Sequence, residues 1–337
     1  MMPHRFAPAL IACVLCSASV AALAQPASAP ASKAAPAATV SPLTVQAAPT
    51  PKVVEKLSRS FVQSYAAVPN PELDQIGRWH DPVCVQVEGM SADQAAMIKA
   101  RIESVAQALG LRATRPGCRA NVEIVFSAQP QAVMDLVAKR REDLLGYYHR
   151  HDHDRLKTVT RPIQSWYQTA TRGEGNNGTF VGGVFLDRDG LPIPPAQIPG
   201  VQLERETVDD PDSVPPTGCA DSHFSTCRKS MFQNVFMVAD SKALEGQDLG
   251  LVADDMALLA LSQPRSLDGC NALPSVIDRF AKTPCVGRDP PDGLTPADAA
   301  YLTALYQSDP EARKASAQSD IALSMARILI RANAVPH

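Results

Sequence analysis

The chain has 337 residues, of which 45% are hydrophobic and 20% are charged, and its formal net charge is −3 at pH 7. A chain of this length can bury a substantial core, as one large domain or two smaller ones. The weak, balanced charge excludes a general nucleic-acid-binding surface, so we expect no nucleic-acid partner.

Residues 1–24 predict an export signal. Arg5 makes the start weakly positive, an apolar run follows, and Ala22 and Ala24 form a small-residue cleavage site. The alternative is a lipoprotein modified at Cys13, because the residues before this cysteine resemble a lipobox. We expect a periplasmic or secreted protein, and no later apolar run approaches the roughly 20 residues of a membrane span.

Composition divides the rest of the chain. Residues 25–51 form an Ala/Pro/Ser tract with almost no charge, which predicts a disordered tether. Residues 52–335 predict a single globular α+β domain, because strand signals gather early and helix signals late. An alternative subdivides this domain into 52–170 and 217–335 around the irregular, Pro- and Asp-rich stretch 171–216.

The first half of the domain predicts a β-α-β unit between two helices. Apolar residues recur at helical or strand spacing, and Ser91 with Gln94 forms a capping box. The expected elements are a helix over 52–66, a strand over 83–87, a helix over 91–110, a strand over 122–126 and a helix over 133–146.

The second half predicts strands followed by helices. Trp166 and Tyr167 indicate a short strand, and a hairpin and an apolar strand follow. Helix starts are marked by Thr295 with Pro296 and by Asp309 with Pro310. The expected elements are a hairpin over 180–191, a strand from Phe232, and helices over 249–263, 274–281, 295–306 and 309–332.

The helix over 249–263 is apolar on most of its sides, so we expect its neighbours to bury it. A metalloprotease would carry H-E-x-x-H on such a helix, and this chain lacks that motif. Asp254 and Asp255 interrupt the apolar surface. We expect both to point to solvent or to cap a neighbouring element.

Eight cysteines, less Cys13 and Cys16 in the signal segment, leave six in the mature chain. An even number in an exported protein predicts disulfides, and fifteen pairings are open. No two cysteines have the spacing of a zinc knuckle. The simplest pairing joins neighbours in sequence: Cys84 with Cys118, Cys219 with Cys227 and Cys270 with Cys285.

His149, His151 and His153 alternate with acidic residues in the sequence YYHRHDHD. Extended backbone would place the three imidazoles on one side, where they could bind zinc, copper or nickel. The alternative is a solvated loop after a helix end, where histidines favour the helix dipole. We therefore keep zinc as a weak candidate cofactor and expect no other.

Recognised catalytic and nucleotide-binding motifs are missing. Gly173, Gly175 and Gly178 match G-x-G-x-x-G, but strand formers follow where a dinucleotide site needs a helix. The chain contains neither G-x-S-x-G nor a P-loop. We therefore assign no catalytic residue.

Several stretches together carry a resemblance: Arg78 to Met90, Gly117 to Ser127, Arg161 to Arg172, Phe236 to Asp278, and the sequence LTPADAAYLTALY. They resemble a family of uncharacterised exported proteins of alphaproteobacterial type, over Lys52 to Leu329. The resemblance implies export and assigns no activity. More remotely, PSVID followed by LTPADAAYLTALY is similar to lipoproteins related to the zincin peptidases. Without H-E-x-x-H, no catalytic residue carries over.

We expect a non-catalytic periplasmic or envelope protein, and the remote resemblance implies a degenerate zincin-like domain without its metal ligands. Two alternatives stay open. One is a hydrolase with a dispersed site, metal-assisted through the three histidines. The other is a binding module that recognises a cell-envelope or protein partner through the irregular surface 192–216.

Overall fold

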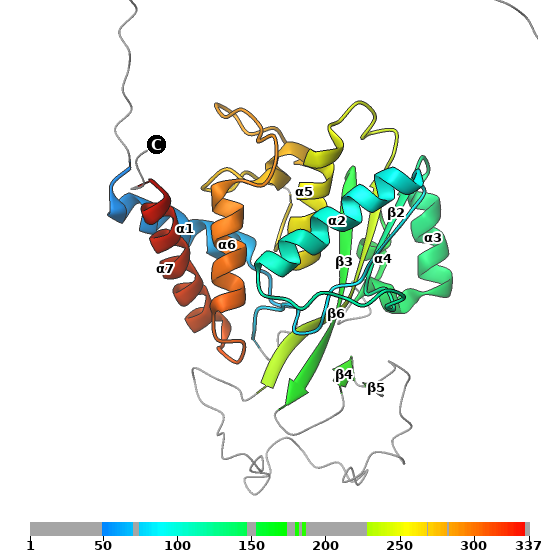
Figure 1. Ribbon diagram of the computed structural model, residues 1–337, viewed down its shortest axis with the longest axis horizontal. Coiled ribbons are helices and arrows are strands. Elements are labelled where there is room, and N and C mark those ends of the chain that lie inside the picture. The colour runs from blue at the N-terminus through cyan, green and yellow to red at the C-terminus, as the bar shows by residue number, and fades with distance from the viewer. Residues whose placement is uncertain are drawn as a thin grey trace, which may run out of the picture. The chain divides into compact units, whose positions relative to one another are not determined.

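The computed structural model describes residues 49–69, 74–146, 153–173, 179–181, 184–186, 228–267, 269–281 and 283–333 (Figure 1). The described residues all belong to one compact unit. The predicted signal segment, nearly all of the tether and most of the irregular stretch 171–216 lie outside the described residues.

A six-stranded mixed sheet, in the order β1-β2-β6-β3-β4-β5, forms the centre of this unit. Strands β1, β2 and β6 run parallel, whereas β3, β4 and β5 each pair antiparallel with the preceding neighbour in that order. The α+β class and the β-α-β unit are confirmed. The strands are β1 Val85–Glu88, β2 Val122–Ser127, β3 Ile163–Gly173, β4 Thr179–Val181, β5 Val184–Leu186 and β6 Arg228–Asp240.

Helices cover both faces of the sheet (Figure 1). Helices α2 and α5 lie on one face, α3 and η1 lie on the other, and α1, α6 and α7 pack together beside α5. The bounds are α1 Pro51–Tyr65, α2 Ala92–Ala108, α3 Pro130–Arg140, η1 Glu142–Leu145, α4 His153–Leu156, α5 Leu249–Leu261, η4 Val276–Phe280, α6 Pro296–Gln307 and α7 Lys314–Asn333.

From Val235 to Ala239, strand β6 is a continuous apolar run, because both of its faces are buried there. Val235 and Met237 face the larger core under α2 and α5. Phe236 and Val238 face a smaller cluster under α3 that includes Trp166. Helix α5 is buried on nearly all sides, as its composition predicts.

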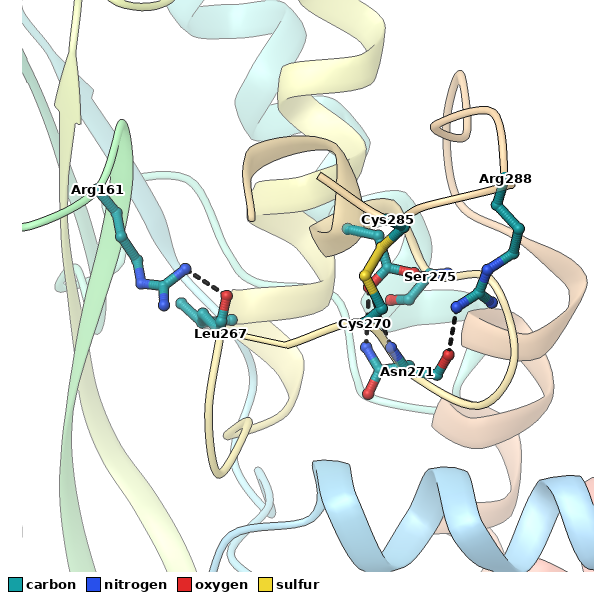
Figure 2. The surroundings of a disulfide bond; sticks show 8 residues. Arg161, Leu267, Cys270, Asn271, Ser275, Cys285 and Arg288 are labelled. Atoms are coloured by element: carbon teal, nitrogen blue, oxygen red, sulfur yellow. Dashed lines mark hydrogen bonds between the residues drawn. A yellow bond between two sulfur atoms is a disulfide. The ribbon is translucent and has the colours of Figure 1, made fainter. Parts of the chain in front are cut away.

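Two of the predicted disulfides are present. Cys84 and Cys118, with Cα atoms 6.2 Å apart, join the start of β1 to the segment before β2. Cys270 and Cys285, with Cα atoms 5.6 Å apart, close a loop that follows α5 (Figure 2). The third predicted pair, Cys219 with Cys227, lies outside the described residues.

Four predicted elements were wrong in type or extent. The strand expected to be short, at Trp166 and Tyr167, is the 11-residue strand β3. The helix over 133–146 breaks at Arg141 into α3 and the 3₁₀ helix η1, and the helix over 274–281 is the 3₁₀ helix η4. The last helix begins at Lys314 because the Asp309 side chain accepts the backbone N–H of Glu311 at 2.9 Å, forming a turn in place of a helix start.

The C-terminal end of α5 is buried, so its last four carbonyl groups need partners from outside the helix. Side chains from four parts of the chain donate to them. The donors and carbonyls are Ser262 Oγ to Leu258 (2.8 Å), Tyr167 Oη to Leu259 (2.8 Å), Trp79 Nε1 to Ala260 (2.7 Å) and Tyr306 Oη to Leu261 (2.9 Å). These bonds fix β3, the segment before β1 and α6 around the end of α5.

We expect Tyr306→Phe to lower the free energy of unfolding by about 1–2 kcal/mol, because the Leu261 carbonyl loses its donor without any change in packing volume. Urea denaturation measures the loss. Tyr301→Phe, on the same helix, is the matched control, since the buried Tyr301 hydroxyl has no hydrogen-bond partner. Its removal should be neutral or slightly stabilising. Equal losses in the two variants would contradict the role of these donors.

Candidate functional site

The predicted histidine site is not covered by the structure. His149 and His151 lie outside the described residues, and His153 is described only as the first backbone position of α4. Among the residues that are described, no group of His, Cys, Asp or Glu side chains is arranged to hold a metal ion. The metal site at these three histidines therefore stays a prediction.

The glycine pattern is followed by a strand. Strand β3 ends at Gly173, and β4 begins at Thr179, one residue after the last glycine of the pattern. A pyrophosphate site of this type needs a helix N-terminus at that point. The structure therefore agrees with the sequence in excluding a dinucleotide fingerprint here.

Asp254 caps a neighbouring element, as predicted. Its carboxylate accepts the backbone N–H of Leu294 at 2.9 Å and pairs with Arg101 on α2. A Cβ atom on Gly293 would lie 2.7 Å from Asp254 Oδ2, so a side chain there would disturb this contact. Asp254 thus ties α5 to α2 and to the segment that leads into α6.

For Asp255 the prediction is wrong, because its side chain neither reaches solvent nor caps an element. It is 2% exposed, and its Oδ1 atom has no hydrogen-bond partner. Burial raises the pKa of Asp255 to about 8, with a further increase from Asp298 and an opposing effect from Arg161. Asp255 is therefore a neutral carboxylic acid near pH 7.

The stretch PSVID and the start of LTPADAAYLTALY form one buried polar network. Asp298 accepts hydrogen bonds from Ser275 Oγ (2.6 Å) and from the backbone N–H groups of Val276 (2.9 Å) and Thr295 (3.0 Å). Thr295 and Asp298 also form the capping box of α6. The network holds the disulfide-closed loop against α6, so these motifs have a structural role.

A cleft of about 630 Å³ lies beside β3, within the usual size range of ligand pockets. We call it the β3 cleft. Five chain segments and one helix start contribute to its lining. They are residues 66–68 after α1, 145–146 at the end of η1, 155–156 in α4, the stretch from Thr158 to Tyr167, 263–267 after α5, and Lys314 at the start of α7.

The walls of the β3 cleft are held by backbone hydrogen bonds. The N–H of Ala67 donates to Gln263 O (3.1 Å), and the N–H of Arg265 donates to Tyr65 O (2.6 Å), so the segment after α5 is joined to the end of α1. Gly146 adopts φ 61°, and a Cβ atom there would lie 1.8 Å from Tyr167 O. Only glycine allows this close approach to β3.

The lining of the β3 cleft is positively charged. Arg155, Arg161, Arg265 and Lys314 contribute to it, and no Asp or Glu appears among its described residues. Arg161 donates to the carbonyl oxygen of Leu267 (Figure 2). Within the described ranges, Arg265 and Lys314 have no carboxylate partner. These two side chains can therefore bind a negatively charged ligand in the cleft.

The charged side chains of the described lining are cations suited to an anionic ligand. The described lining contains no His, Cys, Asp or Glu that could act as a general base or nucleophile. Burial raises the pKa of Tyr167, whose hydroxyl already donates to the carbonyl of Leu259. Guanidinium and ammonium groups bind carboxylates and phosphates without any such machinery.

Sequence reasoning did not find this cleft. Nothing in the sequences around Arg161 and Arg265, RPIQSWYQTATR and SQPRS, marks either arginine as a ligand. Single basic residues at the surface are common and carry no spacing signal. Comparison with protein-family models, curated proteins and solved structures finds no match.

The neutral Asp255 should make stability depend on pH. The native carboxyl keeps its proton up to about pH 8, whereas the unfolded chain releases it near pH 4. The unfolded state therefore binds fewer protons, and the free energy of unfolding should fall between about pH 4 and pH 8 and level off above.

Asp255→Asn should remove this part of the pH dependence, which amounts to a few kcal/mol at most. Urea denaturation of both proteins at pH 5 and pH 8 measures it. Contributions from groups that do not interact with Asp255 are common to the two proteins and cancel in the comparison. An identical decrease in the variant and the wild type would contradict the assignment of a neutral Asp255.

Proposed function

We propose that this protein is exported to the periplasm or beyond, and that it is a non-catalytic protein that binds an anionic ligand in the β3 cleft. The observation that carries the proposal is the pair Arg265 and Lys314, which line the cleft without a carboxylate partner among the described residues. Arg155 and Arg161 add positive charge to the same lining. Four cations around one concave surface favour a negatively charged ligand.

Carboxylate and phosphate groups are the chemistry that this lining would recognise. An arginine side chain can donate two parallel hydrogen bonds to either group, whereas the lysine contributes a compact charge. A cell-envelope component that carries such groups would be a suitable partner in the proposed location. The proposal places the ligand in the β3 cleft, in contrast to the surface 192–216, which lies outside the described residues.

Export is supported by two independent features. The first 24 residues have the pattern of a signal peptide, and two disulfides join cysteines of the folded unit. Disulfides persist mainly in oxidising compartments outside the cytosol. Among the described helices, none has the length and apolar character needed to cross a membrane.

Binding can be tested with citrate, pyrophosphate and polyphosphate as probes in isothermal titration calorimetry. Arg265→Gln combined with Lys314→Gln should weaken binding at least tenfold, because each lost charged contact costs about 1.5–3 kcal/mol. Raising the salt concentration should weaken wild-type binding. The same loss is expected for each probe that binds.

The matched control carries Lys56→Gln and Arg59→Gln. Both residues are exposed on α1 and neither lines the cleft, so the control has the same net charge as the double variant. It should bind as the wild type does. Failure of all three probes to bind the wild type, or equal weakening in the control, would contradict the proposed function.

Export can be tested by expression of the full chain in a Gram-negative host with periplasmic extraction. Mass spectrometry should find Gln25 at the N-terminus, and iodoacetamide should modify no cysteine until the protein is reduced. Recovery in the membrane fraction with a lipidated Cys13 would favour the lipoprotein alternative. An uncleaved chain with free thiols in the cytosol would contradict export.

A further inference from the structure

The first half of β3 is an open edge of the sheet. Strand β6 pairs with β3 along its whole length, from Ile163 to Gly173. On the other side, β4 pairs with β3 only at Thr171, near the C-terminal end of the strand (Figure 1). Among the described strands, the part of β3 from Ile163 to Ala170 therefore has a neighbour on one side only.

The strand register shows which backbone groups of β3 point to the open side. The N–H of Asp240 donates to the Pro162 carbonyl at 2.8 Å, in continuation of the β3–β6 register. In an antiparallel pair, such hydrogen-bonded positions alternate with positions whose N–H and C=O groups point away from the partner strand. Ser165 and Tyr167 lie at odd spacing from Pro162, so their backbone groups point away from β6.

The β3 cleft lies along this open edge. Four consecutive residues of β3, Gln164 to Tyr167, line the cleft. Successive side chains of a strand point to opposite faces of the sheet, and here Tyr167 faces the larger core whereas Trp166 faces the smaller cluster. A hollow over one face would be lined by alternate residues only. The cleft is therefore at the edge of β3, where a further strand would pair.

Three backbone groups of this edge are open to a ligand. Gly146 lies against the Tyr167 carbonyl and closes the edge there. The N–H and C=O of Ser165 and the N–H of Tyr167 have no hydrogen-bond partner within the described part of the chain. An open strand edge of this kind is a template for an extended peptide, which pairs with it through its own backbone.

Cations lie on both sides of this edge. The Tyr167 hydroxyl donates to the end of α5, and the chain that leaves α5 carries Arg265. On the opposite face, Trp166 Nε1 donates to the carbonyl of Leu156 at 2.7 Å, which places α4 and its Arg155 on that side. Because the side chains of an added strand would alternate between the two sides, acidic residues at successive positions would each face a cation.

We propose that the ligand of the β3 cleft is an extended acidic segment of a partner protein, which adds to the sheet as a strand beside β3. The inference rests on the proposed function and names the class of its ligand. The backbone of the segment pairs with Ser165 and with the N–H of Tyr167, and its carboxylates bind the cations of the cleft.

The test is isothermal titration calorimetry of the full mature chain with capped hexaglutamate as the probe. Ser165→Pro removes an N–H that faces the cleft and leaves the β3–β6 ladder intact, since an open strand edge tolerates proline. It should weaken hexaglutamate binding about tenfold or more and leave citrate binding, which needs only the cations, unchanged. The matched control Ser165→Ala also loses the hydroxyl that bonds Tyr167 Oη at 2.9 Å, and it should bind hexaglutamate as the wild type does.

A second measurement uses only the wild-type protein and so does not depend on how a variant folds. Hexaglutamate with every backbone nitrogen methylated keeps its charge but cannot donate to a strand. It should bind about tenfold more weakly than the unmodified peptide. Equal binding of the two peptides, or unchanged hexaglutamate binding in Ser165→Pro, would overturn strand addition while leaving the cleft as an anion site.

Two further outcomes separate the alternatives. Binding of citrate, pyrophosphate or polyphosphate without binding of hexaglutamate would overturn the acidic segment and keep the proposed function, whereas failure of all four probes would overturn both. Light scattering tests a second copy of this chain as the occupant of the edge. A dimer of the free protein that Ser165→Pro converts to a monomer would assign the edge to that copy and overturn the proposal.

Discussion

The fold depends on how the buried C-terminal end of α5 satisfies its backbone. A helix leaves its last four carbonyls without partners, and inside a protein each unpaired group costs free energy. Here Ser262, Tyr167, Trp79 and Tyr306 supply one donor to each. Because three of these donors come from β3, from the segment before β1 and from α6, the same bonds that complete α5 also position the elements around it.

The β3 cleft follows from that arrangement. The chain leaves α5 directly into residues 263–267, which form one wall of the cleft and carry Arg265. Tyr167 both donates to the end of α5 and lines the cleft, so the buried core and the candidate site share a side chain. The two adjacent aspartates of α5 differ in their surroundings. Asp254 contacts α2 and the segment before α6, whereas Asp255 is buried and its Oδ1 atom has no hydrogen-bond partner.

Much of the fold could be predicted from local signals in the sequence. The Ser91 capping box, the alternation around Val122 and the Thr295 cap each act within a few residues, and the structure has the expected elements there. The disulfides Cys84–Cys118 and Cys270–Cys285 could also be predicted, because each joins two cysteines that follow one another in the order of cysteines along the chain.

The cleft and the burial of Asp255 could not be predicted from the sequence. Four cations from separate segments meet only through tertiary packing, and a single arginine or lysine carries no periodic signal. Successive residues of a helix point about 100° apart, so the phase of an amphipathic pattern decides which of two adjacent aspartates is buried. Helix α5 is apolar nearly all round and gives no such phase.

The most direct test of an anion site in the β3 cleft is a crystal structure of the protein soaked in selenate, with the ion located by its anomalous scattering. We expect selenate in the cleft, in contact with Arg265 and Lys314, with the cleft walls unchanged. Selenate bound only at other surfaces, with the cleft filled by side chains or by water, would contradict the account.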